Sequence, residues 1–320
     1  MKRKRRRVGP GEVGYYHLMS RTAGGEMLFG DREKEVLRGM LWKVADFSGV
    51  RVVTYALMGN HFHLLVEVPP AGEEVPDAEL VRRYRALYPE PTPWRPLGAE
   101  ALAEHLRRDT ELGKAMRSSL RRRMHDVSWL MKTLKQRFSL WYNRGRERRG
   151  TLWEGRFAGV LVEGEPHALR TVAAYVDLNA VRAGLAADPK DYRFCGYGEA
   201  MGGSRRARRG LEAADKDLAG YRRTLYGVGS EAKEGKACLG REEALRVIET
   251  QKGKVPVAAA LRCRVRYFSE GWALGSPEFV REVARAEEPG RKRPPRPHPM
   301  EGADWGGLAV LSGMRKDLFG

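Results

Sequence analysis

Two apolar segments joined by a three-residue turn place the strongest constraint on how this chain can fold. Residues 51–57 and 61–68 are rich in aliphatic and aromatic side chains, and Met58, Gly59 and Asn60 separate them. Glycine and asparagine tolerate the left-handed backbone of a tight turn, so the pattern predicts a β-hairpin. The hairpin in turn indicates an antiparallel sheet.

Segments before and after the hairpin predict further strands and helices. Apolar side chains recur with strand spacing at 15–21 and 157–163. They recur with helix spacing from Asp31, as N-cap, to about Ser48, from Asp126 or Ser128 to Tyr142, and at 165–183. The order of strand, helix, strand, strand, helices, strand and helix predicts an α+β fold. We expect an antiparallel sheet with helices packed on one face.

Changes in composition divide the chain into a basic arm, a main domain, an extension and a tail. The expected bounds are 1–13 for a flexible basic arm, 14–200 for the main domain with a helical insertion at about 70–125, 201–286 for a helical extension, and 287–320 for a Pro- and Arg-rich flexible tail. Within the extension we expect helices at 241–250 and 255–264, and one that starts at Ser276. The extension either binds DNA or serves only as packing.

The charge of the chain favours a polyanionic partner. Lys and Arg number 59 against 41 Asp and Glu, which gives a formal net charge of +18. Each phosphate that a basic protein neutralises releases counterions, so nucleic acid is the expected partner, although such charge can also serve solubility. No apolar run approaches the roughly 18 residues that span a bilayer, so we expect no membrane partner. The three cysteines fit neither a zinc site nor a disulfide framework, which indicates the cytoplasm.

A His-x-His pair lies on the second strand of the hairpin. Side chains alternate along a strand, so His61 and His63 point the same way, with backbones about 6.6–7 Å apart, while Phe62 points into the core. Two imidazoles side by side on a polar face can share one metal ion. The alternative is a pair of ordinary strand histidines that form hydrogen bonds.

A tyrosine and an asparagine lie one helical turn apart in the later helix. Tyr175 and Asn179 are four residues apart, which places them on the same face. The carbonyl oxygen of Asn179 suits Mg²⁺ or Mn²⁺, and the Tyr175 phenol could then meet a phosphate polarised by that ion. The alternative is a surface tyrosine that packs on its neighbours.

Three motifs in order resemble a known class of enzymes. Leu57-Met-Gly-Asn-His-Phe-His63, Trp153-Glu-Gly-Arg-Phe157 and Tyr175-Val-Asp-Leu-Asn-Ala-Val-Arg-Ala-Gly184 resemble the one-tyrosine transposases of the HUH class, closest to the REP-associated (RAYT) branch. The resemblance covers about 14–198, and a weaker match at 266–279 is similar to the C-terminal extension of many such proteins. It identifies 14–200 as a catalytic domain with a ferredoxin-like antiparallel sheet.

The resemblance also implies site residues and an activity. His61, His63 and Asn179 would bind Mg²⁺ or Mn²⁺, and Tyr175 would be the nucleophile of a single-stranded DNA endonuclease and strand transferase. The intermediate would be a 5′-phosphotyrosine, and the expected substrate is single-stranded or hairpin DNA from hairpin-forming repeats. Gly59 stands where relatives usually have Pro or Glu, and Ala180 where they usually have Pro; neither position supplies a catalytic group.

Basic residues near these motifs are candidates for binding DNA. The set comprises Arg144, Arg146, Arg148, Arg149, Arg156, Lys132, Lys135 and Arg137. The Arg144–Arg149 cluster could also be a solvated loop. Tyr142 is a rival nucleophile, but no ligand-type residue accompanies it in a motif.

Several alternatives to a transposase remain open at this point. The first is a non-catalytic nucleic-acid-binding relative on the same fold. The second is a relaxase-type HUH nuclease, which often has its tyrosine before the histidines, and the third is a small-molecule phosphoesterase, which the charge disfavours. The transposase hypothesis needs no nucleotide cofactor, implies a cytoplasmic, nucleoid-associated protein, and leaves monomer or homodimer undecided.

Overall fold

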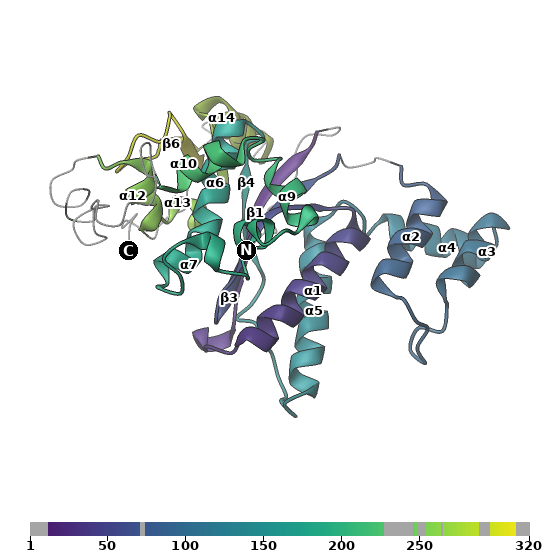
Figure 1. Cartoon of the computed structure of the whole chain (residues 1–320). Helices are drawn as coiled ribbons and strands as arrows, with labels where there is room; N and C mark the ends of the chain where they lie inside the picture. The colour runs from purple at the N-terminus through teal and green to yellow at the C-terminus, as the bar shows by residue number, and fades with distance from the viewer. Residues whose placement is uncertain are drawn as a thin grey trace.

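One seven-stranded sheet forms the core of the structure. In this computed structural model the described residues are 12–70, 74–226, 246, 248, 254–263, 265–287 and 295–311. The strand order is β2-β3-β1-β4-β5-β7-β6 (Figure 1). The bounds are β1 Gly14–Arg21, β2 Arg51–Leu57, β3 His61–Val68, β4 Ala158–Val162, β5 Ala273–Gly275, β6 His298–Pro299 and β7 Ala309–Leu311. Neighbouring strands are antiparallel except β4 and β5, which are parallel.

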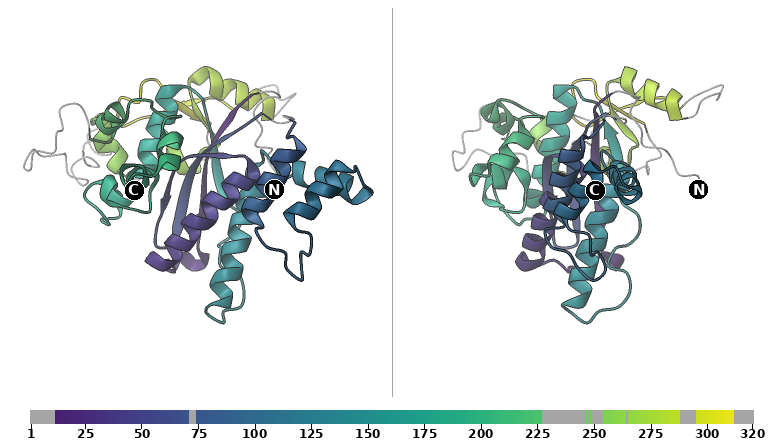
Figure 2. Two further views of the ribbon diagram at one scale, coloured as in Figure 1. Left: turned by 45° about the vertical axis from the view of Figure 1, so that its right-hand side comes forward. Right: turned by 90° about the vertical axis from the view of Figure 1, so that its right-hand side faces the viewer.

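Helices surround this sheet, and three of them form a projecting arm. In chain order they are α1 Asp31–Ser48, α2 Asp77–Leu87, α3 Ala99–Arg107, α4 Glu111–Arg121, α5 Val127–Arg144, α6 Pro166–Asp177, α7 Asn179–Arg182, α8 Gly196–Met201, α9 Arg205–Leu211, α10 Leu218–Tyr226, α12 Val257–Arg262, α13 Tyr267–Glu270 and α14 Pro277–Glu287. Figure 2 shows α2, α3 and α4 standing away from the sheet beyond α5. In the part of the chain that the structure describes, no helix combines the length and apolarity needed to cross a membrane.

Strands β1 to β4 form the predicted antiparallel core. The chain passes through β1, α1, β2, β3, the arm, α5 and β4, and the sheet places β1 and β3 at the centre of this unit. That is the order of a ferredoxin-like βαββαβ unit. The hairpin strands end at Leu57 and begin at His61, as the sequence predicts. The predicted α+β class is confirmed.

Strand register determines which side chains share a face. Met19 of β1 pairs with His63 of β3, so both point to the same side of the sheet. Because side chains alternate, His17 lies on this side as well, two residues before Met19. His61 shares the side of His63 for the same reason. Phe62 points to the opposite face.

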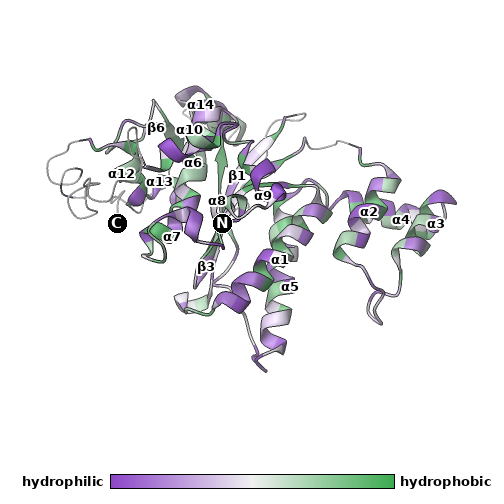
Figure 3. Ribbon diagram, in the orientation of Figure 1, coloured by the Kyte–Doolittle hydropathy of each residue, from purple (hydrophilic) through white to green (hydrophobic). Residues whose placement is uncertain are grey.

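Helical layers cover both faces of the sheet. On the Phe62 side, the rings of Phe62 and of Phe138 from α5 lie 5.5 and 5.9 Å from the ring of Trp153. On the other side, Tyr175 of α6 lies 6.2 Å from His63 between ring centroids. The sequence predicts helices on one face of the sheet, whereas the structure has a helical layer on each face. Figure 3 shows green, hydrophobic segments along the strands of the sheet, and the second layer covers the face on which His17 and His63 lie.

The predicted helical insertion is the projecting arm. Its three helices enclose a small apolar core that includes Leu80, Tyr84, Leu102, Leu106 and Leu120. Arg117 of α4 holds α2 through two hydrogen bonds to Asp77, at 2.8 and 2.7 Å. The insertion is thus a three-helix arm between β3 and α5, and an ion pair between Arg82 of α2 and Asp46 of α1 at 3.4 Å joins it to the main body.

The C-terminal part of the sheet corrects one expectation. Residues 287–320 are rich in proline and arginine and were expected to form a flexible tail, but β6 and β7 lie in the sheet. The apolar run that ends at Leu311 supplies β7, and the Trp305 ring is buried. The proline- and arginine-rich composition indicates disorder more strongly than this short apolar run indicates a strand. The arm expected at 1–13 and the helix expected at 241–250 lie almost entirely outside the described residues.

Capping residues define where several helices begin. Asp126 accepts a hydrogen bond from the Trp129 backbone N–H at 2.9 Å, as expected of the N-cap of α5. Ser276 likewise caps α14, since its Oγ accepts from Phe279 N at 3.2 Å. Asp31 is the first residue of α1 and not its N-cap.

Candidate active site

The two histidines of β3 lie side by side, as the strand pattern requires. The ring centroids of His61 and His63 are 5.1 Å apart, and the rings are nearly perpendicular at 82°. Phe62 between them is fully buried on the opposite face. The hairpin thus fixes two imidazoles at one edge of the same surface.

A hydrogen bond from the hairpin turn fixes the tautomer of His61. The side-chain amide of Asn60 donates to the Gly25 carbonyl oxygen at 2.8 Å, which turns its Oδ1 toward His61. His61 Nδ1 lies 2.6 Å from that oxygen. Because an amide oxygen only accepts, Nδ1 carries the proton and the lone pair of the neutral ring is on Nε2.

A third histidine, which the sequence gave no reason to select, supports His63. His17 Nε2 lies 2.9 Å from His63 Nδ1, and the two rings stack with centroids 5.1 Å apart. The other ring nitrogen of His17 donates to the carbonyl oxygen of Phe268 at 2.7 Å. Burial lowers the pKa of His17 to about 4, so its ring is neutral near pH 7.

These contacts determine the proton positions along the His17–His63 pair. The Phe268 carbonyl can only accept, so the proton of neutral His17 is on Nδ1. Nε2 of His17 is then an acceptor and receives the hydrogen bond from His63 Nδ1–H. The lone pair of His63 is therefore on Nε2, as in His61. Both histidines have the tautomer that metal-binding imidazoles use.

Tyr175 lies against these rings. It is a buried residue near the end of α6, and its ring centroid is 6.0 Å from His17 and 6.2 Å from His63. Its ring also stacks on Phe268 at 4.4 Å with an interplanar angle of 24°. The guanidinium carbon of Arg182 lies 4.0 Å from the Tyr175 ring centroid.

Asn179 lies next to Tyr175, but not on a continuous helix. The helix expected at 165–183 breaks at Leu178, between α6 and α7. The Asn179 side-chain amide donates to the carbonyl oxygens of Val176 at 2.9 Å and Tyr175 at 3.3 Å. These bonds satisfy carbonyls at the end of α6 and leave Oδ1 as the acceptor end of the Asn179 side chain.

Arg182 ties the tyrosine to a neighbouring helix. One of its terminal nitrogens donates to the Tyr175 carbonyl oxygen at 2.7 Å, and the other donates to the Leu261 carbonyl oxygen at 2.6 Å. A cation is thereby held close to the phenol ring and to the two buried histidines.

His61, His63 and Asn179 carry donor atoms of the types that a hard divalent cation can use. No group of three His, Cys, Asp or Glu side chains that could hold a metal exists among the described residues. A cation here would instead need the imidazoles of His61 and His63 together with the Asn179 amide oxygen. Imidazole and carbonyl ligands with open positions for water are compatible with Mg²⁺ or Mn²⁺.

A buried carboxylate anchors the far side of α6. Asp177 accepts hydrogen bonds from Thr54 Oγ1 at 2.7 Å, the Tyr221 hydroxyl at 2.5 Å and Tyr197 N at 3.1 Å. Burial raises the pKa of Asp177 to about 6. These bonds tie α6 to β2 and α10, and so hold the helix that carries Tyr175.

The predicted DNA-binding residues of α5 differ in their surroundings. Lys135 donates to the Gly155 carbonyl oxygen at 2.6 Å, and burial lowers the pKa of Lys135 to about 8. Lys132 lies 4.5 Å from the Trp129 ring centroid. Arg137 lies 5.7 Å from the Tyr88 ring centroid, and burial lowers the pKa of Arg137.

The basic residues after α5 are partly engaged within the protein. Arg146 forms an ion pair with Glu33 at 2.6 Å, and Arg148 donates to the Thr151 carbonyl oxygen at 3.0 Å. Within the described ranges, no ion pair involves Arg144, Arg149 or Arg156. Arg148, whose printed partner is a neutral carbonyl, has no ion pair in these ranges either, so all four arginines have charge available to an external anion.

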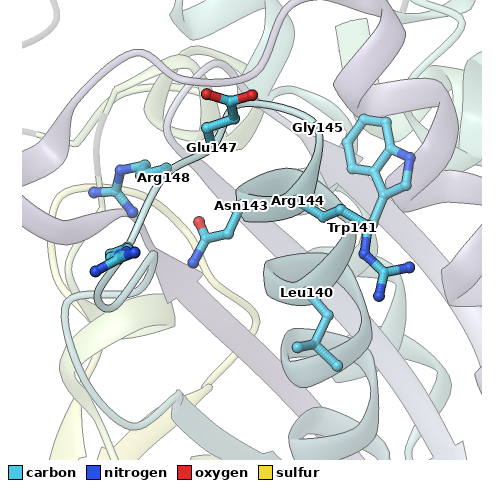
Figure 4. Close-up of a pocket in the computed structure, with 8 residues that line it drawn as sticks. Leu140, Trp141, Asn143, Arg144, Gly145, Glu147 and Arg148 are labelled. Atoms are coloured by element: carbon cyan, nitrogen blue, oxygen red, sulfur yellow. The ribbon is translucent and has the colours of Figure 1, made fainter.

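A hollow of about 1040 Å³ lies at the C-terminal end of α5 (Figure 4). It is lined by Leu140, Trp141, Asn143, Arg144, Gly145, Glu147, Arg148 and Arg149. The lining includes neither the histidines nor Tyr175, so this basic hollow is separate from the candidate active site. Arginine beside an indole ring suits contact with a phosphate or an unpaired base.

Tyr142 does not compete with Tyr175 for the same site. Its ring is buried among Phe29 and Phe138, with centroids 6.4 and 6.1 Å away. This aromatic cluster packs on the Phe62 face of the sheet, and the histidines lie on the other. The structure therefore brings the histidines together with Tyr175 and not with Tyr142.

Comparison with known proteins gives distant structural similarity only. No family model matches the chain, and no curated protein matches it. A solved structure of a REP-associated tyrosine transposase bound to a REP hairpin is similar at a TM-score of 0.40 and 13% sequence identity, over 63% of this chain and 87% of that chain. A similarity of this size assigns neither family nor function.

Proposed function

We propose that this protein is a metal-dependent endonuclease and strand transferase of the transposase type, acting on single-stranded DNA. The observation that carries the proposal is the placement of the Tyr175 ring 6.2 Å from that of His63, with His61 beside it. A buried tyrosine needs no such neighbours to stabilise a core. A tyrosine nucleophile does need polar groups close to its phenol.

The donor set assigns a role to each residue. His61, His63 and Asn179 would hold Mg²⁺ or Mn²⁺, which supplies Lewis-acid polarisation of a phosphate oxygen when bound. The Tyr175 phenol oxygen attacks phosphorus, forming a P–O bond to tyrosine while the bond from phosphorus to the 3′ oxygen breaks. The phenol loses its proton and the departing 3′ oxygen gains one. The reverse step rejoins a strand without a nucleotide cofactor, because one phosphodiester replaces another.

Arg182 complements the charge that gathers during this reaction. Its guanidinium lies 4.0 Å from the Tyr175 ring centroid, on the element that follows the tyrosine. A fixed, partly buried cation stabilises developing negative charge more strongly than one in water. Its bond to the Tyr175 carbonyl oxygen also fixes the backbone of the nucleophile.

Single-stranded or hairpin DNA is the proposed partner. The charge of +18 favours a polyanion. Arg144, Arg149 and Arg156 are not engaged in ion pairs within the described ranges and would contact phosphates. The remaining candidates on and after α5 would also contribute to DNA binding; they are Lys132, Lys135, Arg137, Arg146 and Arg148. We place this activity at the nucleoid in the cytoplasm.

Trapping the covalent intermediate tests the proposal. A labelled hairpin oligonucleotide with a single-stranded flank is incubated with the protein and Mn²⁺, and denaturing gels and peptide mass spectrometry locate any adduct. We expect an adduct on Tyr175 and none in Tyr175→Phe. Tyr142→Phe is the matched control, because it also removes a buried phenol, and should form the adduct normally. An adduct that survives in Tyr175→Phe contradicts the assignment, and hairpin binding without any adduct indicates a non-catalytic DNA-binding protein.

A further inference from the structure

The segment that carries α12 and α13 reaches the candidate active site from the C-terminal side. From the sequence this part of the chain was expected to be a DNA-binding or packing appendage. Figure 1 shows α12 and α13 beside α6, far from the projecting arm. Three sets of contacts join this segment to the residues around Tyr175.

The first contact acts through His17. The backbone carbonyl of Phe268 accepts from His17 Nδ1–H at 2.7 Å, and His17 Nε2 lies 2.9 Å from His63 Nδ1. All three groups are buried, so water does not compete for these bonds. One carbonyl on α13 therefore determines which nitrogen of His63 carries the lone pair.

The second contact holds the tyrosine ring. The Phe268 side chain stacks on Tyr175 at 4.4 Å, with an interplanar angle of 24°. Trp305, before β7, packs in turn on Phe268 at 5.8 Å between centroids. The Tyr175 ring thus belongs to an aromatic cluster that continues through Phe268 to Trp305, in the segment between β6 and β7.

The third contact runs through Arg182. Its guanidinium bridges the Leu261 carbonyl oxygen on α12 and the Tyr175 carbonyl oxygen on α6, at 2.6 and 2.7 Å. The Arg182 fork is therefore oriented by both helices. Movement of α12 would displace the cation next to the phenol ring.

We infer that His17 and Phe268 are positioning residues of the proposed reaction, so that the α12–α13 segment is an integral part of the active site. His17 acts through His63, by holding the tautomer whose Nε2 can bind a metal. Phe268 acts on Tyr175, by restricting the orientation of the phenol. This inference rests on the proposed function, but its first test does not depend on DNA cleavage.

The tautomer of His63 in the metal-free protein is the first measurement. Histidine ¹⁵N NMR distinguishes a proton on Nδ1 from a proton on Nε2, and we expect the Nδ1–H form for His63 in the wild type. His17→Phe keeps a ring against His63 but removes the acceptor, so the Nε2–H form should appear. His17→Gln restores a carbonyl acceptor near the former Nε2 position and should return His63 toward the Nδ1–H form. An unchanged His63 signal in His17→Phe overturns the role of His17.

Metal affinity is the second measurement. We expect Mn²⁺ binding to the protein, measured by calorimetry, to weaken about 10- to 100-fold in His17→Phe and by less in His17→Gln. Tyr84→Phe is the matched control, because it also removes a hydrogen bond of a buried side chain, to the Leu97 carbonyl oxygen, but lies in the projecting arm. Equal affinity losses in His17→Phe and Tyr84→Phe would show a merely structural role. Circular dichroism checks that each variant is folded. If His17→Phe does not fold, the Mn²⁺ affinity and the His63 tautomer of His17→Gln are compared with those of the wild type instead.

Phe268→Leu tests the other half of the inference. The substitution removes the stacking ring and keeps the backbone carbonyl, so Mn²⁺ affinity and the His63 tautomer should stay as in the wild type. The single-turnover rate of adduct formation should fall about tenfold or more, because the nucleophile is less well oriented. An unchanged rate overturns the role of Phe268. If the wild type forms no adduct while the His63 tautomer still responds to His17, the proposed function fails and the role of His17 in orienting His63 stands.

Discussion

Arg182 and Tyr175 are joined twice, once at the backbone and once at the ring. The guanidinium donates to the Tyr175 carbonyl oxygen at 2.7 Å and lies 4.0 Å from the ring centroid. Arg182 makes these contacts from α7, the short helix that follows the interruption at Leu178. Tyr175 and Arg182 are thus close in the sequence but lie on two different helices.

Replacing Arg182 by lysine should impair cleavage while charge is kept. Lysine cannot donate to two carbonyls in the geometry of a guanidinium, so we expect the rate of adduct formation in Arg182→Lys to fall about 10- to 100-fold. Single-turnover assays with labelled hairpin DNA measure this. Arg117→Lys in the arm is the matched control, since Arg117 also binds two acceptors, on Asp77. A similar fall in both variants would contradict a special role for Arg182.

Removing either histidine should abolish tight metal binding. Changes to residues that support a metal ligand typically weaken metal binding about 10- to 100-fold. We expect a larger loss of Mn²⁺ affinity in His61→Ala and His63→Ala, because each removes a ligand itself. Chelation by EDTA should stop adduct formation in the wild type, and added Mn²⁺ should restore it. His105→Ala, in α3 of the arm, provides a control whose affinity should not change. Metal binding that survives both substitutions would place the cation elsewhere.

Stability should respond to pH through Asp177. Its pKa is raised by burial to about 6 from an ordinary value of 3.8, so the folded protein retains a proton that the unfolded chain releases. The favourable contribution is present below about pH 4 and is lost as pH rises through about 6, by on the order of 3 kcal/mol. We expect the free energy of unfolding of wild type, relative to Asp177→Asn, to fall by this amount from pH 4 to pH 7. Urea titrations measure it, and a constant difference would show that Asp177 does not titrate in this range.

Arginines without ion pairs should dominate the salt dependence of DNA binding. Replacing Arg144 and Arg149 by glutamine should weaken hairpin binding and reduce the slope of log affinity against log salt by about 0.7 for each lost phosphate contact. Fluorescence anisotropy at several salt concentrations measures the slope. Arg107→Gln removes an exposed arginine that pairs with Glu104 at 2.7 Å, and its slope should match the wild type. Equal slopes in all variants would exclude this surface from the DNA path.

Local sequence patterns predict the parts of the fold that depend on neighbours in the chain. The hairpin, α1 and the start of α5 follow from alternation, helical periodicity and capping by Asp126. The placement of Tyr175 on a helix facing the histidines agrees with its motif. The sequence could not predict the break at Leu178, because it depends on how the Asn179 amide bonds to the preceding carbonyls.

The residues that sequence analysis missed act through long-range pairing. In the sequence, His17 is a residue of an apolar strand and belongs to no motif. The register of β1 on β3 places it next to His63. Phe268 gives no local signal either, since its role comes from the packing of α13 against α6 and β1. The strands near the C-terminus were missed because proline-rich composition predicts disorder, whereas β5 and β6 offer pairing partners for the short apolar run that forms β7.

The hydrogen bond between His17 and Phe268 spans 251 positions of the chain. At a synthesis rate of about 5–20 residues per second, the ribosome adds Phe268 roughly 12–50 seconds after His17. For most of that time the nascent chain contains both β3 histidines and, later, the tyrosine, but not the carbonyl that orients His17. The full set of contacts around Tyr175 and His63 can therefore form only after the ribosome has added Phe268.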